Sequence, residues 1–304
     1  MSAETRTDLT PLAVRAAALW LAAGALFKLF AGTPADLPPV LHDLPISIDL
    51  FFKLAIGIEL SLVGLAFLRP KLAWLPMIAM FLVFDAILAM VLSSGAESCG
   101  CFGSSITIPP AVMMGIDSVL LIAILLTKPW SSEAKGMGPA LLLPAFLAGV
   151  IVLPFLYIGD TTIQVDEETG TFKPESVRYI VIEPTSWKDQ LVYDTEFASL
   201  FPTEIEMLPT DGRYIFWRWT CDHCATHLQE LADTDDGSAP IVLVRLTEDQ
   251  DNDENRAVLA MPAGGHVTEL ALPAGPQYVI ETPADFVLEG GVVVSAREGI
   301  GAGE

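Results

Sequence analysis

Five apolar stretches near the start of the chain limit its fold more than any other feature of the sequence. They lie near residues 12–31, 46–68, 71–93, 110–127 and 139–158. Each approaches or exceeds the roughly 20 residues that a helix needs to cross a bilayer. Buried helices of a large soluble protein are the alternative, which so many apolar stretches in so short a segment disfavour. The sequence therefore predicts an all-α transmembrane helical bundle, with the lipid bilayer as its partner.

Charge divides the chain into two halves. Residues 1–159 hold 10 acidic and 8 basic residues, whereas residues 160–304 hold 28 acidic and 8 basic ones. The whole chain is 52% hydrophobic and has a formal net charge of −22, so an almost neutral apolar half precedes an acidic, soluble half. Because a field of this sign repels the phosphate backbone, we expect no nucleic-acid partner.

Lysine and arginine predict the orientation in the membrane. They precede the first apolar stretch and lie in the second and fourth connections, whereas the connections at about 32–45 and 94–109 contain none. This pattern predicts a multi-pass protein of the inner (cytoplasmic) membrane with a cytoplasmic N-terminus, and five crossings place residues 160–304 outside the cytoplasm. A signal peptide is the alternative for the first stretch. Its length, the acidic residues before it and the lack of a clear cleavage site favour a retained helix.

Four cysteines form two close pairs. Cys99 and Cys101 lie in the connection at 94–109, and Cys221 and Cys224 lie in the acidic half. Under the predicted topology both pairs are outside the cytoplasm, where disulfides persist.

The residues around Cys221 and Cys224 predict a thioredoxin-like site. An aromatic, strand-like run at 213–220 precedes the pair and a helical pattern at 225–231 follows it, which is typical of the thioredoxin arrangement. Unpaired N–H groups and the helix dipole stabilise a thiolate at a helix N-terminus. We therefore expect Cys221 to be the attacking thiol and Cys224 the resolving thiol. His223 would stabilise the thiolate when it is charged.

Later residues extend this prediction to an α/β thioredoxin-like domain. The apolar runs predict strands at 241–246, 278–288 and 292–294. They resemble the end of the thioredoxin fold, in which a cis-proline faces the cysteine pair. That resemblance covers roughly residues 176–300 and implies that the bond before Pro283 is cis and that Pro283 belongs to the catalytic site.

Other interpretations of Cys221 and Cys224 stay open. They could form half of a zinc site, although His227 and His266 are poorly spaced to complete it. They could form a structural disulfide, although so short a loop stabilises little. A non-enzymatic maturation factor or copper metallochaperone would hold copper with Cys221, Cys224 and His227, and an extracytoplasmic thiol reductant is a further alternative. We predict no resident metal.

The segment around Cys99 and Cys101 carries a second resemblance. The sequence Cys-Gly-Cys-Phe-Gly that begins at Cys99 is similar to the loop of membrane proteins of the methylamine utilisation MauE type, within the wider DoxX-like group. The elements that contain Lys28 and Glu59 resemble the helix motifs of that family. The resemblance covers about residues 12–128, the four-helix core.

We therefore expect three parts. Residues 1–135 would form a MauE/DoxX-like four-helix membrane domain, residues 136–160 a fifth transmembrane helix, and residues 161–304 an extracytoplasmic thioredoxin-like domain. MauE-type proteins are associated with making methylamine dehydrogenase, a periplasmic enzyme rich in disulfides. The resemblance thus implies a thiol–disulfide oxidoreductase that supports disulfide formation or maturation of exported proteins, whose thiols or disulfides are its partners.

Two cysteine pairs on one side of the membrane suggest a relay. A Cys-x-Cys disulfide is a small strained ring with an oxidising potential, which suits Cys99 and Cys101 as the partner pair. Unbridged cysteines or a soft copper site are the alternatives there. By analogy with DsbB-like and VKOR-like oxidases, a lipid-soluble quinone would accept the electrons, and we expect no covalently bound cofactor.

Ionisable residues within the apolar stretches are functional candidates by default. Lys28, Lys53, Asp85 and Asp117 fall roughly 5–12 Å from the outer ends of their helices, at about 1.5 Å per residue, and Glu59 lies deeper. Opposite charges at one depth can pair across the bundle. The candidates for quinone binding or proton transfer are Lys28, Glu59, Asp85 and Asp117, with structural pairing as the alternative. Trp20 and Trp74 suit the aromatic belt at the membrane interface.

Overall fold

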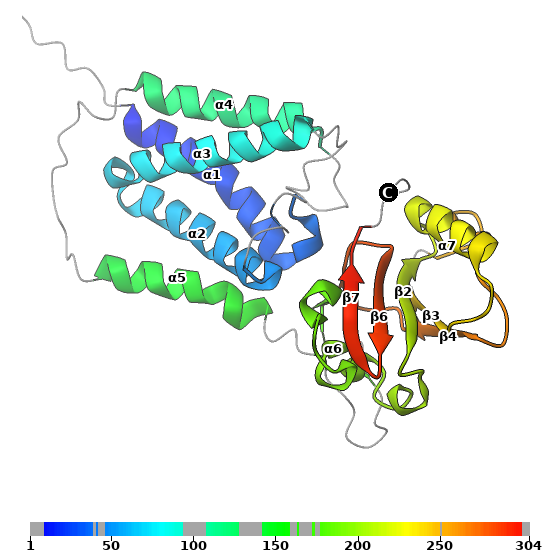
Figure 1. The fold of residues 1–304 in the computed structure, drawn as a ribbon. Coiled ribbons are helices and arrows are strands. Elements are labelled where there is room, and N and C mark those ends of the chain that lie inside the picture. Colours follow the sequence, from blue (N-terminus) through cyan, green and yellow to red (C-terminus); the bar gives the residue numbers. More distant parts are fainter. Residues whose placement is uncertain are drawn as a thin grey trace, which may run out of the picture. The chain divides into compact units, whose positions relative to one another are not determined.

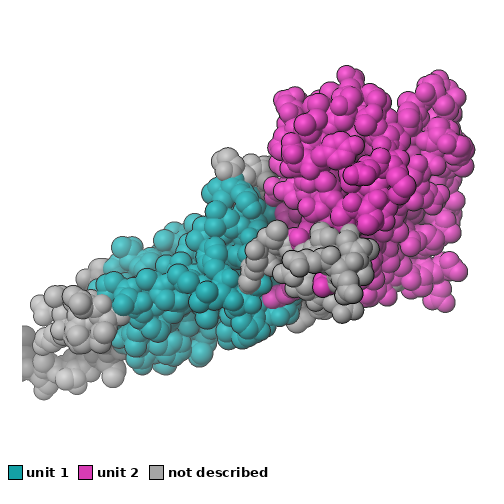
Figure 2. Space-filling view, turned by 90° about the horizontal axis from the view of Figure 1, so that it is seen from below, with its two compact units in different colours: residues 1–159 teal, residues 160–304 magenta. Residues whose placement is uncertain are grey.

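The computed structural model divides the chain into two compact units, residues 1–159 and 160–304, which Figure 2 shows in different colours. Cys99 and Cys101 lie outside the residues that the structure describes. The described residues are 9–38, 41, 46–93, 108–127, 142–158, 163, 172–173, 177–249 and 251–299.

Apolar helices make up the first unit (Figure 1). All five stretches predicted from the sequence contain a helix, and a short 3-10 helix, η1, follows the first of them. By length and composition α1, α2 and α3 could each cross a membrane, and α4 and α5 are shorter apolar helices. The bounds are α1 (Thr10–Phe30), η1 (Pro34–Asp36), α2 (Ile48–Leu68), α3 (Pro70–Ser93), α4 (Pro110–Leu126) and α5 (Leu142–Ile158).

Small side chains line the core that α1 to α4 share. Ala17 and Ala18 of α1, Ala66 of α2 and Ala73 of α3 are all fully buried in one cluster with Phe81 of α3. Small residues at helix contacts let the backbones approach closely, which gives apolar helices van der Waals contacts that lipid cannot supply.

Two glycines of α2 make room for α5. A Cβ added at Gly57 would lie 2.9 Å from the backbone oxygen of Ile151, and one at Gly64 would meet the ring of Phe146. Between them, the Ser61 hydroxyl donates to the Gly57 carbonyl oxygen at 2.7 Å and lies 3.5 Å from that of Leu147. The absence of side chains at these two glycines therefore lets the backbone of α5 approach the backbone of α2 closely.

Replacing Gly57 with alanine is expected to destabilise the membrane unit by about 1–3 kcal/mol, because the added methyl group overlaps backbone that cannot move aside. Gly24→Ala is the matched control, since a Cβ there has no atom within 4 Å. The measurement is the thermal unfolding midpoint of the full chain in detergent micelles. Equal midpoints for the two variants would show that α5 does not pack against α2 in this way.

A five-stranded mixed sheet forms the centre of the second unit, in the order β4-β3-β2-β6-β7 (Figure 1). Strands β2, β3 and β4 are parallel, whereas β6 is antiparallel to β2 and to β7. Helix α7 (Asp222–Thr234) connects β2 to β3. The bounds are β2 (Gly212–Arg218), β3 (Ile241–Leu246), β4 (Val267–Leu272), β6 (Ala284–Glu289) and β7 (Val292–Arg297).

A separate two-stranded parallel sheet pairs β1 (Tyr179–Val181) with β5 (Gln277–Val279). Short helical turns fill the segment between β1 and β2. They are η5 (Pro184–Trp187), η6 (Val192–Asp194), α6 (Glu196–Leu200) and η7 (Ile205–Met207).

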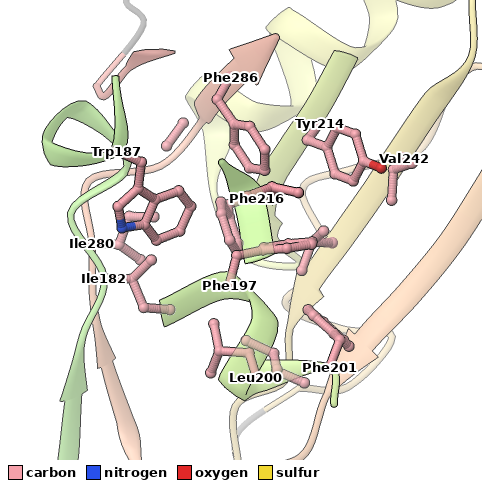
Figure 3. Packing of buried hydrophobic residues seen from close by; sticks show 14 of the residues in the cluster. Ile182, Trp187, Phe197, Leu200, Phe201, Tyr214, Phe216, Val242, Ile280 and Phe286 are labelled. Carbon is pink, nitrogen blue, oxygen red and sulfur yellow. The ribbon is translucent and has the colours of Figure 1, made fainter. Parts of the chain in front are cut away.

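Alternate residues of the central strands face opposite sides of the sheet. On one side, Tyr214 and Phe216 of β2 pack with Phe286 of β6 and with Trp187 and Phe197 from the preceding turns. Figure 3 shows these rings gathered in one cluster; the Phe197 and Phe286 ring centroids are 5.4 Å apart. On the other side, Ile215 and Trp217 pack in a second cluster that includes Cys224 and Leu228 of α7.

The predicted strand at 241–246 is confirmed as β3, and a sheet-containing domain follows the helices as expected. The single strand predicted at 278–288 is wrong, because β5 ends at Val279 and β6 begins at Ala284 in a different sheet. Pro283 lies in this break and has no N–H to donate to a ladder. The outer strand β4 was not predicted.

Candidate functional site

The cysteine pair of the second unit lies where β2 leads into α7. Strand β2 ends at Arg218, and Cys221 is the N-cap residue of α7. The structure joins Cys221 and Cys224 as a disulfide, with Cα atoms 5.1 Å apart. The backbone N–H of Cys224 donates to Cys221 Sγ at 3.0 Å. A backbone N–H at the helix N-terminus, which has no acceptor within the helix, thus points at Cys221 Sγ. This donor and the helix dipole favour negative charge on that sulfur.

The two sulfurs differ in their surroundings. Cys224 is fully buried against the sheet, whereas Cys221 is partly exposed. Asp222 and His223, between them, are exposed on the first turn of α7. An incoming thiol would therefore meet Cys221 before Cys224.

The segment before β6 faces Cys221. The Thr282–Pro283 peptide bond is cis, as the resemblance to the thioredoxin ending predicted. Cys221 Sγ lies 3.5 Å from the carbonyl oxygen of Thr282 and 3.6 Å from its hydroxyl oxygen. The structure thus brings Cys221, Cys224 and Pro283 into one region, and their catalytic roles and that of His223 stay predictions.

Arg218 is the residue that sequence reasoning missed. Its guanidinium donates to the carbonyl oxygens of Tyr278 (2.5 Å) and Ile280 (3.2 Å) and to the hydroxyl of Thr282 (3.4 Å). Its Nε lies 3.2 Å from a carboxylate oxygen of Glu248. Burial lowers the pKa of Arg218, and the negative charges of Glu248 and Asp251 oppose that shift. The available signal was a lone arginine at the end of an apolar strand.

Trp219 shields the other side of the loop before the cysteines. The guanidinium of Arg256 lies 4.1 Å from the centroid of its ring and that of Arg245 lies 5.3 Å away, both within cation–π range. The backbone N–H groups of Ala257 and Val258 donate to the Trp219 carbonyl oxygen at 3.0 and 3.3 Å. The segment after β3 is therefore fastened to the residues that precede Cys221.

His227 belongs to a different group of charges. Its Nε2 lies 3.3 Å from a guanidinium nitrogen of Arg213, which pairs with buried Asp285. Burial lowers the pKa of His227, and the charge of Arg213 lowers it further. Within the described part of the chain, no three His, Cys, Asp or Glu residues are grouped so that they could hold a metal ion. The copper set of Cys221, Cys224 and His227 is therefore not assembled in this structure.

Two ion pairs involve the candidate ionisable residues in the described part of the membrane unit. Lys28 of α1 forms an ion pair with Glu59 of α2, and its Nζ lies 5.8 Å from the ring centroid of Phe84 of α3. Lys53 pairs with Asp49 of its own helix at 2.9 Å. The expectation that charges at one depth pair across the bundle is thus corrected for Lys28, because its long side chain reaches the deeper Glu59.

The two aspartates bond to uncharged donors. Trp20 Nε1 donates to Asp117 Oδ1 at 2.9 Å, and the Ser118 hydroxyl donates to Asp85 Oδ2 at 3.2 Å. Trp20 therefore bonds to a buried carboxylate, and its place in the aromatic belt stays a prediction. Lys28, Glu59, Asp85 and Asp117 remain candidates for proton transfer or quinone binding, and the structure places them on four adjacent helices.

Comparison with known proteins shows a family similarity in the first unit. Residues 8–131 match the family described as methylamine utilisation protein MauE. This part of the chain is similar to the MauE family. The match spans α1 to α4 and the segment that contains Cys99 and Cys101, and it ends before α5 and the second unit. The apolar helices and this similarity together indicate a membrane protein. No curated protein and no solved structure matches the chain.

Proposed function

We propose that the chain is a membrane-bound thiol–disulfide oxidoreductase whose catalytic pair is Cys221 and Cys224. The observation that carries this proposal is the geometry of the pair. A partly exposed sulfur at the N-terminus of α7 accepts a backbone N–H and is joined to a fully buried one. Helix N-termini lower the pKa of a cysteine thiol, and the thiolate is the species that exchanges disulfides.

In the proposed reaction, a client thiolate attacks Cys221 Sγ, the Cys221–Cys224 bond breaks, and Cys224 leaves as a thiolate. A second client thiolate then attacks the client sulfur of the mixed disulfide and releases Cys221. The client loses two electrons and two protons, and the cysteine pair gains them. Cys221 is the attacking thiol in the reverse direction, with Cys224 as the resolving thiol.

The topology predicted from the sequence places Cys99 and Cys101 on the same side of the membrane as the second unit. We propose that their disulfide reoxidises Cys221 and Cys224, and that a quinone in the bilayer then takes the two electrons and two protons. Maturation of exported proteins, of the kind that methylamine utilisation requires, would be the purpose. The membrane carboxylates would supply the proton path.

The test uses the oxidised full chain in lipid nanodiscs and a reduced peptide that contains two cysteines. We expect one peptide disulfide per cysteine pair, and continued turnover when a soluble quinone is added. A chain that was first reduced and alkylated is the control. Absence of peptide oxidation by protein whose Cys221–Cys224 bond is intact would overturn the proposal. Efficient disulfide reduction without oxidation would instead identify a thiol reductant.

A further inference from the structure

The partly buried side chain of Arg218 connects the end of β2 to the segment that faces the cysteines. Arg218 projects to the side of the sheet opposite α7 and bonds to three acceptors within residues 278–282. That segment connects β5 in one sheet to β6 in the other. Residues 280–283 lie between the two strands and belong to neither. Arg218 is therefore one of the residues that hold this segment, beside the strands on either side of it.

The bonds of Thr282 have a definite direction. A guanidinium only donates hydrogen bonds, so the Thr282 hydroxyl accepts from Arg218 Nη1 at 3.4 Å. The single proton of that hydroxyl is left for another acceptor, and Cys221 Sγ lies 3.6 Å away. With the Cys224 N–H at 3.0 Å, the sulfur of Cys221 faces two donors from different parts of the chain.

Arg218 is also held from a second side. Its Nε lies 3.2 Å from Glu248, and the same carboxylate accepts the hydroxyl of Thr220 at 3.2 Å. Thr220 is the residue immediately before Cys221. Arg218 thus contacts Glu248, which is itself bonded to the loop that carries Cys221, and also the segment that faces Cys221.

We propose that Arg218 is a positioning residue for this site, which holds the Thr282 hydroxyl so that its proton points at the sulfur of Cys221. The inference rests on the proposed exchange function and names what tunes its nucleophile. When the pair is reduced, the Cys221 thiol loses its proton to water, and the two donors stabilise the thiolate. That thiolate then attacks a client disulfide, so that a Cys221–client bond forms and the other client sulfur leaves with the electron pair.

The experiment measures the rate at which iodoacetamide alkylates Cys221 as a function of pH. It uses the reduced full chain in nanodiscs, with peptide mass spectrometry to separate Cys221 from the other cysteines. In the wild type we expect a midpoint below the value of about 8.5 for a free cysteine. In Thr282→Val and Arg218→Met we expect a higher midpoint and an alkylation rate about threefold to tenfold lower at pH values below it.

A conservative variant, a control variant and a double variant distinguish positioning by Arg218 from a general loss of structure. Thr282→Ser keeps the hydroxyl and should keep the wild-type profile. Arg245→Met removes a guanidinium from the neighbouring strand, over Trp219, and should also keep it. If Arg218 acts through Thr282, the double variant Arg218→Met/Thr282→Val should shift no further than Thr282→Val alone.

Each result decides the inference. A wild-type profile in Arg218→Met, or additive shifts in the double variant, would overturn it. Should Arg218→Met fail to fold, Arg218→Lys replaces it, since a compact ammonium lacks the planar guanidinium fork that reaches Tyr278, Ile280 and Thr282 together. An unchanged profile in that variant overturns the inference equally. These failures leave peptide oxidation by the wild type intact. A wild type that oxidises no dithiol peptide would instead refute the proposed function.

Discussion

Replacing Cys221 with serine will lower the rate of dithiol oxidation by more than about a thousandfold, because it removes the only sulfur of the pair that a client can reach. Replacing Cys224 will have a different result. Cys224 is fully buried, and in the reverse direction, in which the reduced pair attacks a client disulfide, its proposed role is to release the client from Cys221. Without it the mixed disulfide between Cys221 and a client should accumulate.

Mass spectrometry of the full chain measures this result after incubation with the disulfide-linked dimer of a single-cysteine peptide. The Cys221 thiolate attacks that disulfide, keeps one peptide and releases the other as a thiol. Cys224→Ser should carry one peptide on Cys221, and Cys221→Ser should carry none on Cys224. Comparable labelling of Cys224 in the Cys221→Ser variant would show that the buried sulfur is accessible and that the assigned order of attack is wrong.

The same variant tests the relay to the membrane cysteines. We expect Cys224→Ser/Cys99→Ser or Cys224→Ser/Cys101→Ser, when oxidised with a soluble quinone, to form a disulfide between Cys221 and the remaining loop cysteine, detected as a cross-linked peptide. If neither does, although the thiols are reactive, the two pairs serve different partners. The second unit would then act as a tethered oxidoreductase beside an independent membrane unit.

Replacing Arg213 with methionine is expected to destabilise the second unit by about 3 kcal/mol, because it leaves a buried carboxylate without its closest cation. Asp285 lies on β6 with a side chain only 4% exposed, and Arg213 Nε on the neighbouring β2 donates to it at 2.7 Å. Arg297 approaches the same carboxylate at 3.5 Å, with a side chain 62% exposed.

Arg297→Met is therefore the matched control, with an expected cost below about 1 kcal/mol. Hydrogen–deuterium exchange of peptides from β2 and β6 measures the difference in the intact chain. Arg213→Met should speed their exchange about a hundredfold. Arg213→Met/Asp285→Leu should recover most of the stability that Arg213→Met loses. Equal effects of the two arginine variants would refute the larger contribution assigned to Arg213.

Local pattern was enough to predict the elements that bury a continuous apolar run. Each predicted membrane helix contains an observed one, and β3 has the predicted bounds, since Ile241–Leu246 is buried at five of its six positions. The start of α7 at the cysteine pair was equally readable, because a strand-like run gives way there to a helical one.

Features that depend on distant partners were not predictable. Strand β4 is an outer strand in which Glu269 alternates with more apolar residues, so its run is weakly apolar. The three-residue pairing of β1 with β5 joins segments almost a hundred residues apart. Arg218 and Lys28 looked like isolated charges in apolar runs, and their partners lie on other elements. Sequence spacing cannot show such contacts, which only the folded chain creates.

The place of Thr282 near the end of the chain sets the order in which the cysteine site is completed during synthesis. Strand β2, α7 and β3 can associate as soon as they leave the ribosome, whereas the antiparallel neighbour of β2 is β6, some seventy residues later. Domains fold as their segments emerge. Cys221 thus exists for a time without the residues that face it, and a nascent chain gains a finished site only after its membrane helices and all residues up to β6 have been translated.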